Sequence, residues 1–152
     1  MRITQWGEYG VHFSTHIATR EREGKPIVGA AEIAHDQGVD IQYAQQILQR
    51  LRRGGIIDSV RGPQGGYKLT RAAAEISLLD ILVAAEGDTF ELICEAKPLG
   101  QARCSSEAFC GLRPIWYDLK EHVNEFLRRY TLESLASTTA DQPPIQIGRD
   151  AT

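Results

Sequence analysis

The chain has 152 residues, of which 42% are hydrophobic and 24% are charged, and its formal net charge is −3. This composition suits a folded domain with a hydrophobic core and excludes both a disordered chain and a simple polycation that coats nucleic acid. Residues 1–16 lack the apolar run of a secretory signal, and no segment reaches the roughly 18 apolar residues of a membrane span. We therefore expect a cytoplasmic protein with no membrane partner.

Positive charge is concentrated in one part of this acidic chain. Residues 46–71 contain six basic residues and a single acidic residue. A localised basic surface is typical of proteins that bind the phosphates of DNA. A solvated basic helix would explain the same run if nothing else pointed to DNA.

The first predicted element is a helix from Thr4 to about Thr19. Threonine is a good N-cap, and apolar or small residues recur after it at helical spacing. We expect this stripe to be buried: Trp6, Tyr9, Gly10, Phe13 and Ile17. Glu8 and His12 lie four residues apart on another face, where such a pair is usually a surface contact.

The next elements predict a winged helix-turn-helix. A short helix over residues 30–36 stops at Gly38, and Asp40 caps a third helix over residues 41–53. Two helices joined by a tight turn with glycine form a helix-turn-helix candidate. Residues 56–69 then predict a β-hairpin, called the wing, because two short strands flank a glycine-rich turn.

The second half of the chain predicts two helices separated by a loop. Ser77 and Asp80 form a capping box at the start of a helix that ends at Gly87. Over residues 112–135 apolar residues recur every three or four positions, a seam typical of helices that pair in a homodimer, although it could also pack onto its own domain. The seam consists of Leu112, Trp116, Leu119, Val123, Phe126 and Tyr130.

Together these elements predict a mainly α fold with a small β-hairpin wing. Its parts are a winged helix-turn-helix DNA-binding domain over residues 1–87, a cysteine-bearing sensor loop over 88–111, a dimerisation helix over 112–136 and a disordered tail over 137–152.

The polar face of the helix over residues 41–53 carries the groups expected to read DNA. Its apolar face should be buried through Ala44, Ile47, Leu48 and Leu51. Amide and guanidinium groups can pair with base edges in the major groove, and positions early in the helix suit this role. We expect base contacts from Gln42, Tyr43 and Gln45, and phosphate contacts from Arg50, Arg52 and Arg53. In the wing, Arg61 suits the minor groove, and glycines such as Gly65 let the backbone approach the duplex.

Three segments resemble the iron–sulfur winged-helix regulator family typified by IscR and NsrR. The most specific is the wing sequence over residues 59–69, and the others are residues 1–4 and 131–135. The resemblance covers about residues 1–136. It implies a dimer with exchanged long helices, a helix-turn-helix with a wing, and an iron–sulfur sensor beside the dimer helix.

All three cysteines, Cys94, Cys104 and Cys110, fall in the predicted loop, with nine and then five residues between them. Thiolates ligate iron–sulfur clusters, zinc or copper(I), and three unlinked thiols are the alternative. The spacing departs from the family's common pattern, in which five residues separate each pair. Arg113 stands where many members have a histidine.

The resemblance also implies a different ligand set. Some family members hold a two-iron two-sulfur cluster with a glutamate and a histidine of the first helix and two cysteines of the partner subunit. Matching residues are present here, so our hypothesis is a cluster held by Glu8, His12, Cys104 and Cys110. Cys94 is then a spare thiol or an alternative ligand, and His16 is a less favoured substitute.

These observations predict a DNA-binding transcription regulator whose affinity for a double-stranded operator is controlled by an iron–sulfur cluster that senses redox state, nitric oxide or iron–sulfur status. One alternative is a cluster-free repressor switched by cysteine oxidation, a small molecule or a protein partner. Another is a protein-binding module with structural zinc. An enzyme is not expected, because no nucleophile–base pair or phosphate-cradling loop is recognisable.

Overall fold

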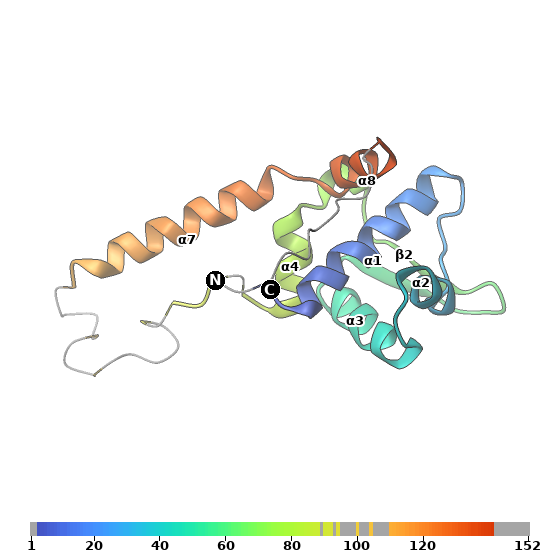
Figure 1. Ribbon diagram of the computed structural model, residues 1–152, viewed down its shortest axis with the longest axis horizontal. Coiled ribbons are helices and arrows are strands. Elements are labelled where there is room, and N and C mark those ends of the chain that lie inside the picture. The colour runs from blue at the N-terminus through green and yellow to red at the C-terminus, as the bar shows by residue number, and fades with distance from the viewer. Residues whose placement is uncertain are drawn as a thin grey trace, which may run out of the picture.

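The computed structural model of the chain describes residues 3–88, 90–92, 94, 100, 104 and 110–141. These residues form six α-helices and one antiparallel hairpin, which confirms the predicted mainly α fold with a wing (Figure 1). The helices are α1 (Gln5–Arg22), α2 (Ala30–Gln37), α3 (Ile41–Arg53), α4 (Leu78–Glu86), α7 (Leu112–Arg128) and α8 (Leu132–Asp141), and the strands are β1 (Ile57–Val60) and β2 (Gly66–Leu69). None of the described helices combines the length and the apolar character that crossing a bilayer requires.

Helix starts follow the predicted caps. The Thr4 hydroxyl accepts from the backbone N–H of Trp6, and the Asp40 carboxylate accepts from Gln42. Ser77 and Asp80 form the expected reciprocal capping box before α4. These side chains satisfy N–H groups that have no partner inside the helix, so they fix where each helix begins.

The core lies where α1 meets α2, α3 and α4. Phe13 and Ile17 of α1 are fully buried, and Trp6 and Tyr9 are partly buried against the same cluster, as expected from the helical stripe. The remaining large, fully buried side chains include Ile33, Ile47, Leu48, Leu51, Ile56 and Ile81. The core therefore holds the helix-turn-helix against α1.

Helix α4 approaches α1 and α3 at glycine positions. A Cβ on Gly10 would lie 2.9 Å from the Cβ of Ala85. A Cβ on Gly54, just after α3, would lie 2.7 Å from the Cα of Ala84. Real Cβ atoms do not approach so closely, because protein interiors are already close-packed. The backbones of the three helices can adopt this arrangement only while these positions lack side chains.

The carboxylate of Glu86, the last residue of α4, completes the start of α1. Its Oε1 accepts from the backbone N–H of Thr4 at 2.6 Å, from the Thr4 hydroxyl at 3.0 Å and from the N–H of Gly7 at 3.0 Å. A negative charge is also favourable at the positive end of a helix dipole. The orientation of α1 is thus tied to the end of α4.

The wing includes a third segment that the sequence did not predict. The N–H of Val28 donates to the carbonyl of Tyr67 at 2.9 Å, and the N–H of Tyr67 donates to the carbonyl of Val28 at 2.8 Å. This pair lies beside β2, whose other edge pairs with β1. The segment before α2 therefore anchors the base of the wing to the helix-turn-helix.

The prediction of a single long helix over residues 112–135 is wrong. Helix α7 ends at Arg128, and α8 begins at Leu132. Between them the chain pairs with the start of α4: the carbonyl of Tyr130 accepts from Leu78, and the N–H of Leu132 donates to the carbonyl of Ile76, both at 2.8 Å. These long-range hydrogen bonds replace those that would have continued the helix.

Helix α8 folds back onto the N-terminal domain instead of extending α7. The N–H of Thr131 donates to the Ser134 hydroxyl, and the N–H of Ser134 donates to the Thr131 hydroxyl. This reciprocal cap starts the new helix. Leu132 and Ala136 are then buried in the main core, and α8 packs beside α1 (Figure 1). The helix continues to Asp141, so the disordered tail expected from residue 137 does not begin there, and residues 142–152 lie outside the described residues.

Replacing Glu86 with alanine should lower the free energy of unfolding by about 2 kcal/mol, because three hydrogen bonds to one carboxylate are lost. Glu75→Ala is the matched control, since the Glu75 side chain is exposed, and it should stay within about 0.5 kcal/mol of the parent. Urea unfolding at one fixed protein concentration measures both. Equal stability of the two variants would contradict this role of Glu86.

Candidate nucleic-acid interface and metal-ligating residues

Helix α3 has one buried face and one face open to solvent. Ala44, Ile47, Leu48 and Leu51 are completely buried, as the sequence predicted. Because these residues fix the rotation of the helix, its polar side chains must point outward. The exposed residues on α3 include Gln42, Gln45, Gln46, Gln49, Arg52 and Arg53.

The polar face of α3 and the wing form one surface. A shallow groove of about 440 Å³ is lined by α3 residues and by Tyr67 of β2. The lining residues from α3 are Gln42, Gln45, Gln46, Gln49 and Arg52. Tyr67 was not singled out as a site residue from the sequence; its position in the wing directly after Gly65 and Gly66 was the available signal. The helix and the wing can therefore contact one ligand together.

The tip of the wing is a tight turn with an exposed arginine. The N–H of Gly65 donates to the carbonyl of Gly62 at 3.0 Å, and Gly62 has a φ of 115°. A Cβ on Gly65 would overlap the carbonyl oxygen of Val60, so a side chain does not fit there. Arg61 next to this turn is exposed. The glycines allow the sharp reversal that presents the Arg61 guanidinium to solvent.

Tyr43 is only half-exposed because it packs against α1. Its ring centroid lies 5.4 Å from that of Trp6 and 5.7 Å from that of Tyr9. Offset and edge-on arrangements at such distances stabilise aromatic pairs. Tyr43, which the sequence predicted to contact a base, therefore also packs α3 against α1.

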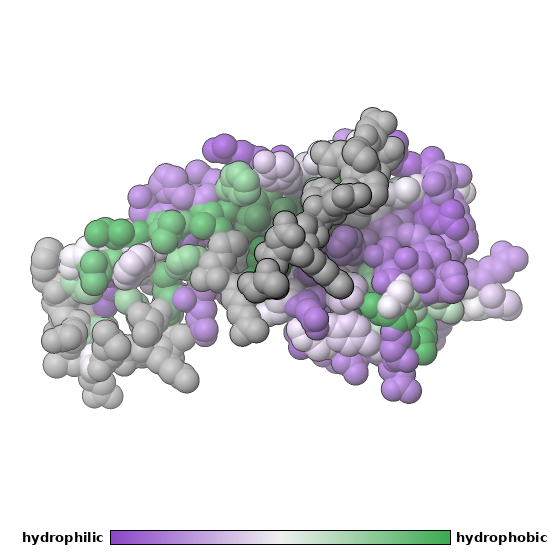
Figure 2. All heavy atoms as spheres, viewed as in Figure 1, coloured by the Kyte–Doolittle hydropathy of each residue, from purple (hydrophilic) through white to green (hydrophobic). Residues whose placement is uncertain are grey.

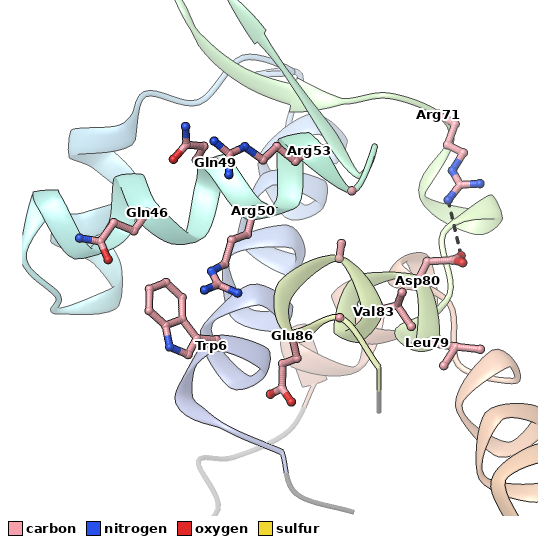
Figure 3. A pocket seen from close by; sticks show the side chains of 13 residues that line it. Trp6, Gln46, Gln49, Arg50, Arg53, Arg71, Leu79, Asp80, Val83 and Glu86 are labelled. Atoms are coloured by element: carbon pink, nitrogen blue, oxygen red, sulfur yellow. Dashed lines mark ion pairs between the residues drawn. The ribbon is translucent and has the colours of Figure 1, made fainter. Parts of the chain in front are cut away.

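The three arginines predicted to bind phosphate have different surroundings. The guanidinium of Arg50 lies 4.2 Å from the centroid of the Trp6 ring and donates to the carbonyl of Ala85 at 3.0 Å. Figure 3 shows it turned toward α1, while Arg53 extends along α3. Arg52 lies 3.9 Å from the carboxylate of Asp58, a surface pair of little strength. Arg53 and Arg52 are therefore the freer cations, and Arg50 is part of the packing.

A wide hollow of about 810 Å³ lies beside Arg50, between α3, α4 and the start of α1 (Figure 3). Arg53 and Arg71 reach its rim, and Arg71 is paired with Asp80 at 3.5 Å. Gly54 and Ala84, which form one of the two close glycine contacts, also line the hollow. The hollow is therefore an open depression at the junction of α1, α3 and α4 rather than a closed ligand cavity.

The predicted pair of first-helix ligands is adjacent and accessible. The Nε2 atom of His12 lies 3.2 Å from Oε1 of Glu8, and both side chains are more than half exposed. Their separation of four residues places them one above the other on α1. A carboxylate oxygen and an imidazole nitrogen at this spacing can bind one ion together.

The three cysteines are free thiols and half-buried. Among the described residues, no group of three or more potential ligands within metal-binding spacing combines Glu8 or His12 with a cysteine of the same chain. Cys110 lies just before α7, whose N-terminal end is remote from α1 (Figure 1). The Arg113 guanidinium donates to the carbonyl of Cys104 at 2.9 Å, so Cys104 is held near the same end of α7.

Helix α7 presents apolar side chains to solvent. Leu127 and Val123 pack against Leu79 and Leu82 of α4, but the N-terminal part of the helix extends away from the domain (Figure 1). Figure 2 shows hydrophobic side chains along it. The large exposed apolar residues on α7 are Leu112, Ile115, Tyr117, Leu119 and Phe126, and Tyr130 just beyond its end is also exposed. Four of the six predicted seam residues are among them. Such a continuous apolar surface indicates a protein contact.

Comparison with known sequences identifies regulators of transcription. A family model described as "Rrf2: Iron-dependent Transcriptional regulator" matches residues 3–138. The HTH-type transcriptional regulator IscR of Pectobacterium carotovorum subsp. carotovorum is 32% identical over 156 aligned residues, which cover 99% of this chain and 92% of the relative. IscR of Serratia proteamaculans is 34% identical over 137 residues, which cover 90% of this chain and 80% of the relative.

Solved structures show the same fold. CymR, titled the global cysteine regulator of B. subtilis, has a TM-score of 0.71 and 27% identity, with 91% of this chain and 98% of that chain covered. IscR of T. potens has a TM-score of 0.69 and 27% identity, with coverage of 94% and 93%. The oxidized form of Staphylococcus aureus CymR has a TM-score of 0.63 and 31% identity, with coverage of 90% and 96%.

Arg50→Ala should destabilise the protein by about 1–2 kcal/mol, because it removes a cation–π contact and a hydrogen bond to a carbonyl. Arg53→Ala removes the same charge three residues later, from a side chain that extends along α3, and should change stability by less than about 0.5 kcal/mol. Denaturant unfolding compares the two. Equal effects would show that the contact of Arg50 with Trp6 contributes nothing.

Proposed function

The chain belongs to the Rrf2 family of transcriptional regulators, and from this premise we propose that it binds operator DNA as a homodimer under the control of an iron–sulfur cluster. Its relatives are named as transcriptional regulators, so the chain is a regulator and not an enzyme. The observation that carries the DNA-binding proposal is the single exposed surface formed by α3 and the wing. The cytoplasmic location stays a prediction.

Two parts of this surface would enter neighbouring grooves of a duplex. Gln42 and Gln45, at the start of α3, are placed to contact base edges in the major groove, with Tyr43 beside them. Arg61 at the wing tip would enter the minor groove, where the turn at Gly65 brings the backbone close to the duplex. Arg52 and Arg53 would neutralise phosphates. Arg50 supports these contacts by fixing α3 on α1.

We assign the exposed apolar surface of α7 to a second copy of this chain. A homodimer would place two reading surfaces on one duplex, as two-fold operators require. Covering a large apolar side chain completely is worth about 1.5–3 kcal/mol, and several of them are half-exposed on α7. In this arrangement residues 112–128 of α7 are the dimerisation helix, and α8 belongs to the DNA-binding domain.

The donor set fits an iron–sulfur cluster held between the two subunits. Glu8 and His12 are adjacent, exposed and on α1, whereas Cys104 and Cys110 lie near the far end of α7. We therefore propose that these cysteines complete the site of the partner subunit, that the cluster is of the two-iron two-sulfur type, and that Cys94 is not required. When bound, the cluster would supply a redox-active centre whose net charge changes with its oxidation state.

Helix α1 provides a physical route from this site to the DNA surface. It carries Glu8 and His12 on one face and contacts α3 through Trp6 and Tyr9 on another. A small movement of α1 would therefore move Tyr43 and Arg50 with it. The proposed coupling requires that the ligand state at Glu8 and His12 favours one position of α1 over another.

A cluster-free regulator switched by cysteine oxidation is the second candidate. It is favoured by the similarity to CymR, including its oxidized form, and by the presence of three free thiols. The two candidates share the DNA-binding surface and differ in iron content. Colourless protein after anaerobic isolation and reconstitution would select the thiol switch.

Gln45→Ala and Arg61→Ala should each weaken operator binding by about 5- to 100-fold, the range expected for loss of a base contact worth about 1–3 kcal/mol. The measurement is fluorescence anisotropy at one salt concentration, with an operator selected in vitro from random duplexes. Arg22→Ala is the matched control, because Arg22 reaches Ser137 of α8 on the side of α1 away from α3 (Figure 1). Unchanged affinity in both variants would exclude this surface as the reader.

Glu8→Ala, His12→Ala, Cys104→Ser and Cys110→Ser should each lose most of the iron and sulfide bound after anaerobic reconstitution, whereas Cys94→Ser should retain them. Absorption spectra and iron and sulfide analyses measure the loading. Full loading in both Glu8→Ala and His12→Ala would refute the ligand assignment.

A heterodimer separates ligation across the dimer from ligation within one chain. One subunit carries Glu8→Ala with His12→Ala, and the other carries Cys104→Ser with Cys110→Ser. If the cysteines cross the dimer, one site keeps all four ligands and the heterodimer binds half the iron of the parent. If each chain holds its own cluster, both sites are broken and the heterodimer binds none.

A further inference from the structure

A group of three potential metal ligands joins α1 to α2, away from the cysteines. Nε2 of His16 lies 3.8 Å from Oε1 of Glu32 and 3.6 Å from Oδ2 of Asp36. Among the described residues, this is the only group of three or more His, Cys, Asp or Glu whose donor atoms all lie within 4.8 Å of one another. Glu32 and Asp36 are themselves one helical turn apart on α2.

The imidazole Nε2 at the centre of this group has no hydrogen-bond partner among the described residues. Nε2 of His16 is buried and makes no hydrogen bond, and its side chain is 14% exposed. Leaving a buried polar atom unsatisfied costs about 1–3 kcal/mol. Both carboxylates are too far for a good hydrogen bond, yet their distances are close to the roughly 3.0–3.4 Å between neighbouring ligands of one ion bound at about 2.1 Å.

We propose that His16, Glu32 and Asp36 form a binding site for a divalent transition-metal ion of the zinc class. One imidazole nitrogen with two carboxylate oxygens suits such borderline ions, whereas Ca²⁺ and Mg²⁺ prefer oxygen ligands alone. The site uses no cysteine and does not depend on the proposed cluster. An ion there would fasten the first helix of the helix-turn-helix to α1.

Two basic side chains determine how strongly the site attracts a cation. Glu32 accepts from the guanidinium of Arg20 at 2.7–2.8 Å and from the ammonium of Lys25 at 2.5 Å. These contacts, with Lys25 foremost, hold the pKa of the Glu32 carboxyl below its ordinary value, so the carboxylate stays ionised and can act as a ligand. The same positive charges compete with a metal ion. Removing Lys25 should therefore strengthen binding.

Solvent can reach the group from one side. A groove of about 360 Å³ between α1, the end of α2 and α8 is lined by His12, His16, Gln37 and Leu135, with Val11, Thr15 and Thr19. The groove provides an entry path for a hydrated ion. It also runs from His16 to His12, so binding at Glu8 and His12 must be removed in a test of the new site.

The test is isothermal titration of Zn²⁺ into metal-free full-length protein that carries Glu8→Gln and serine at all three cysteine positions. Co²⁺ absorption is the second readout, because it reports the ligand set directly. One ion should bind per chain. His16→Gln and Asp36→Asn should each weaken Zn²⁺ binding at least about tenfold, because each removes one proposed ligand.

Two further variants make the result specific. Lys25→Gln should bind the ion several-fold more tightly. His122→Gln, which removes an exposed imidazole paired with Asp118 on α7, should bind it as the parent does. Circular dichroism checks the fold of each variant; if the parent variant does not fold, the wild-type chain should lose one bound ion on Asp36→Asn. The proposal would be overturned if no Zn²⁺ bound to the parent variant. It would also be overturned if binding survived in both His16→Gln and Asp36→Asn.

Discussion

The close approach of α4 to α1 and α3 is the constraint on which the arrangement of this protein depends. Gly10 and Gly54 face Ala85 and Ala84 with no space for a Cβ, and Glu86 caps α1 one residue further on. Helix α4 is thereby held in close backbone contact with both α1 and the end of α3. The direction in which α3 presents its glutamines, and the face of α1 that carries Glu8 and His12, both follow from this junction.

Much of the fold could be predicted because its signals are local. Thr4, Asp40 and the Ser77–Asp80 box satisfy N–H groups only a few residues away, so the sequence alone reveals them. The break after α7 could not be found from apolar spacing, since Tyr130 continues the seam. It depends on the hydrogen bond from Leu78, which is distant in sequence. The capping pair of Thr131 and Ser134 was the available local signal.

The candidate site was predictable in part for the same reason. Helical spacing correctly placed Glu8 beside His12 and separated the buried face of α3 from its polar face. It could not distinguish Arg50 from Arg53, which lie on the same side of α3, because only the position of Trp6 draws one guanidinium inward. The cysteines present a larger difficulty: their spacing in sequence does not say whether the ligands of one site come from one chain or, as proposed, from two.

The cap on α1 also bears on how the chain folds during synthesis. The carboxylate that completes the first turn of α1 is separated from Thr4 by 82 positions, and buried Leu132 adds another contact to the core around α1 from still further along. Because synthesis proceeds from the N-terminal side, α1 cannot acquire its final N-terminal hydrogen bonds until Glu86 has emerged from the ribosome. Until Leu132 and Ala136 have also emerged, the core around α1 is incomplete, and apolar surface that is exposed in this way is prone to aggregation.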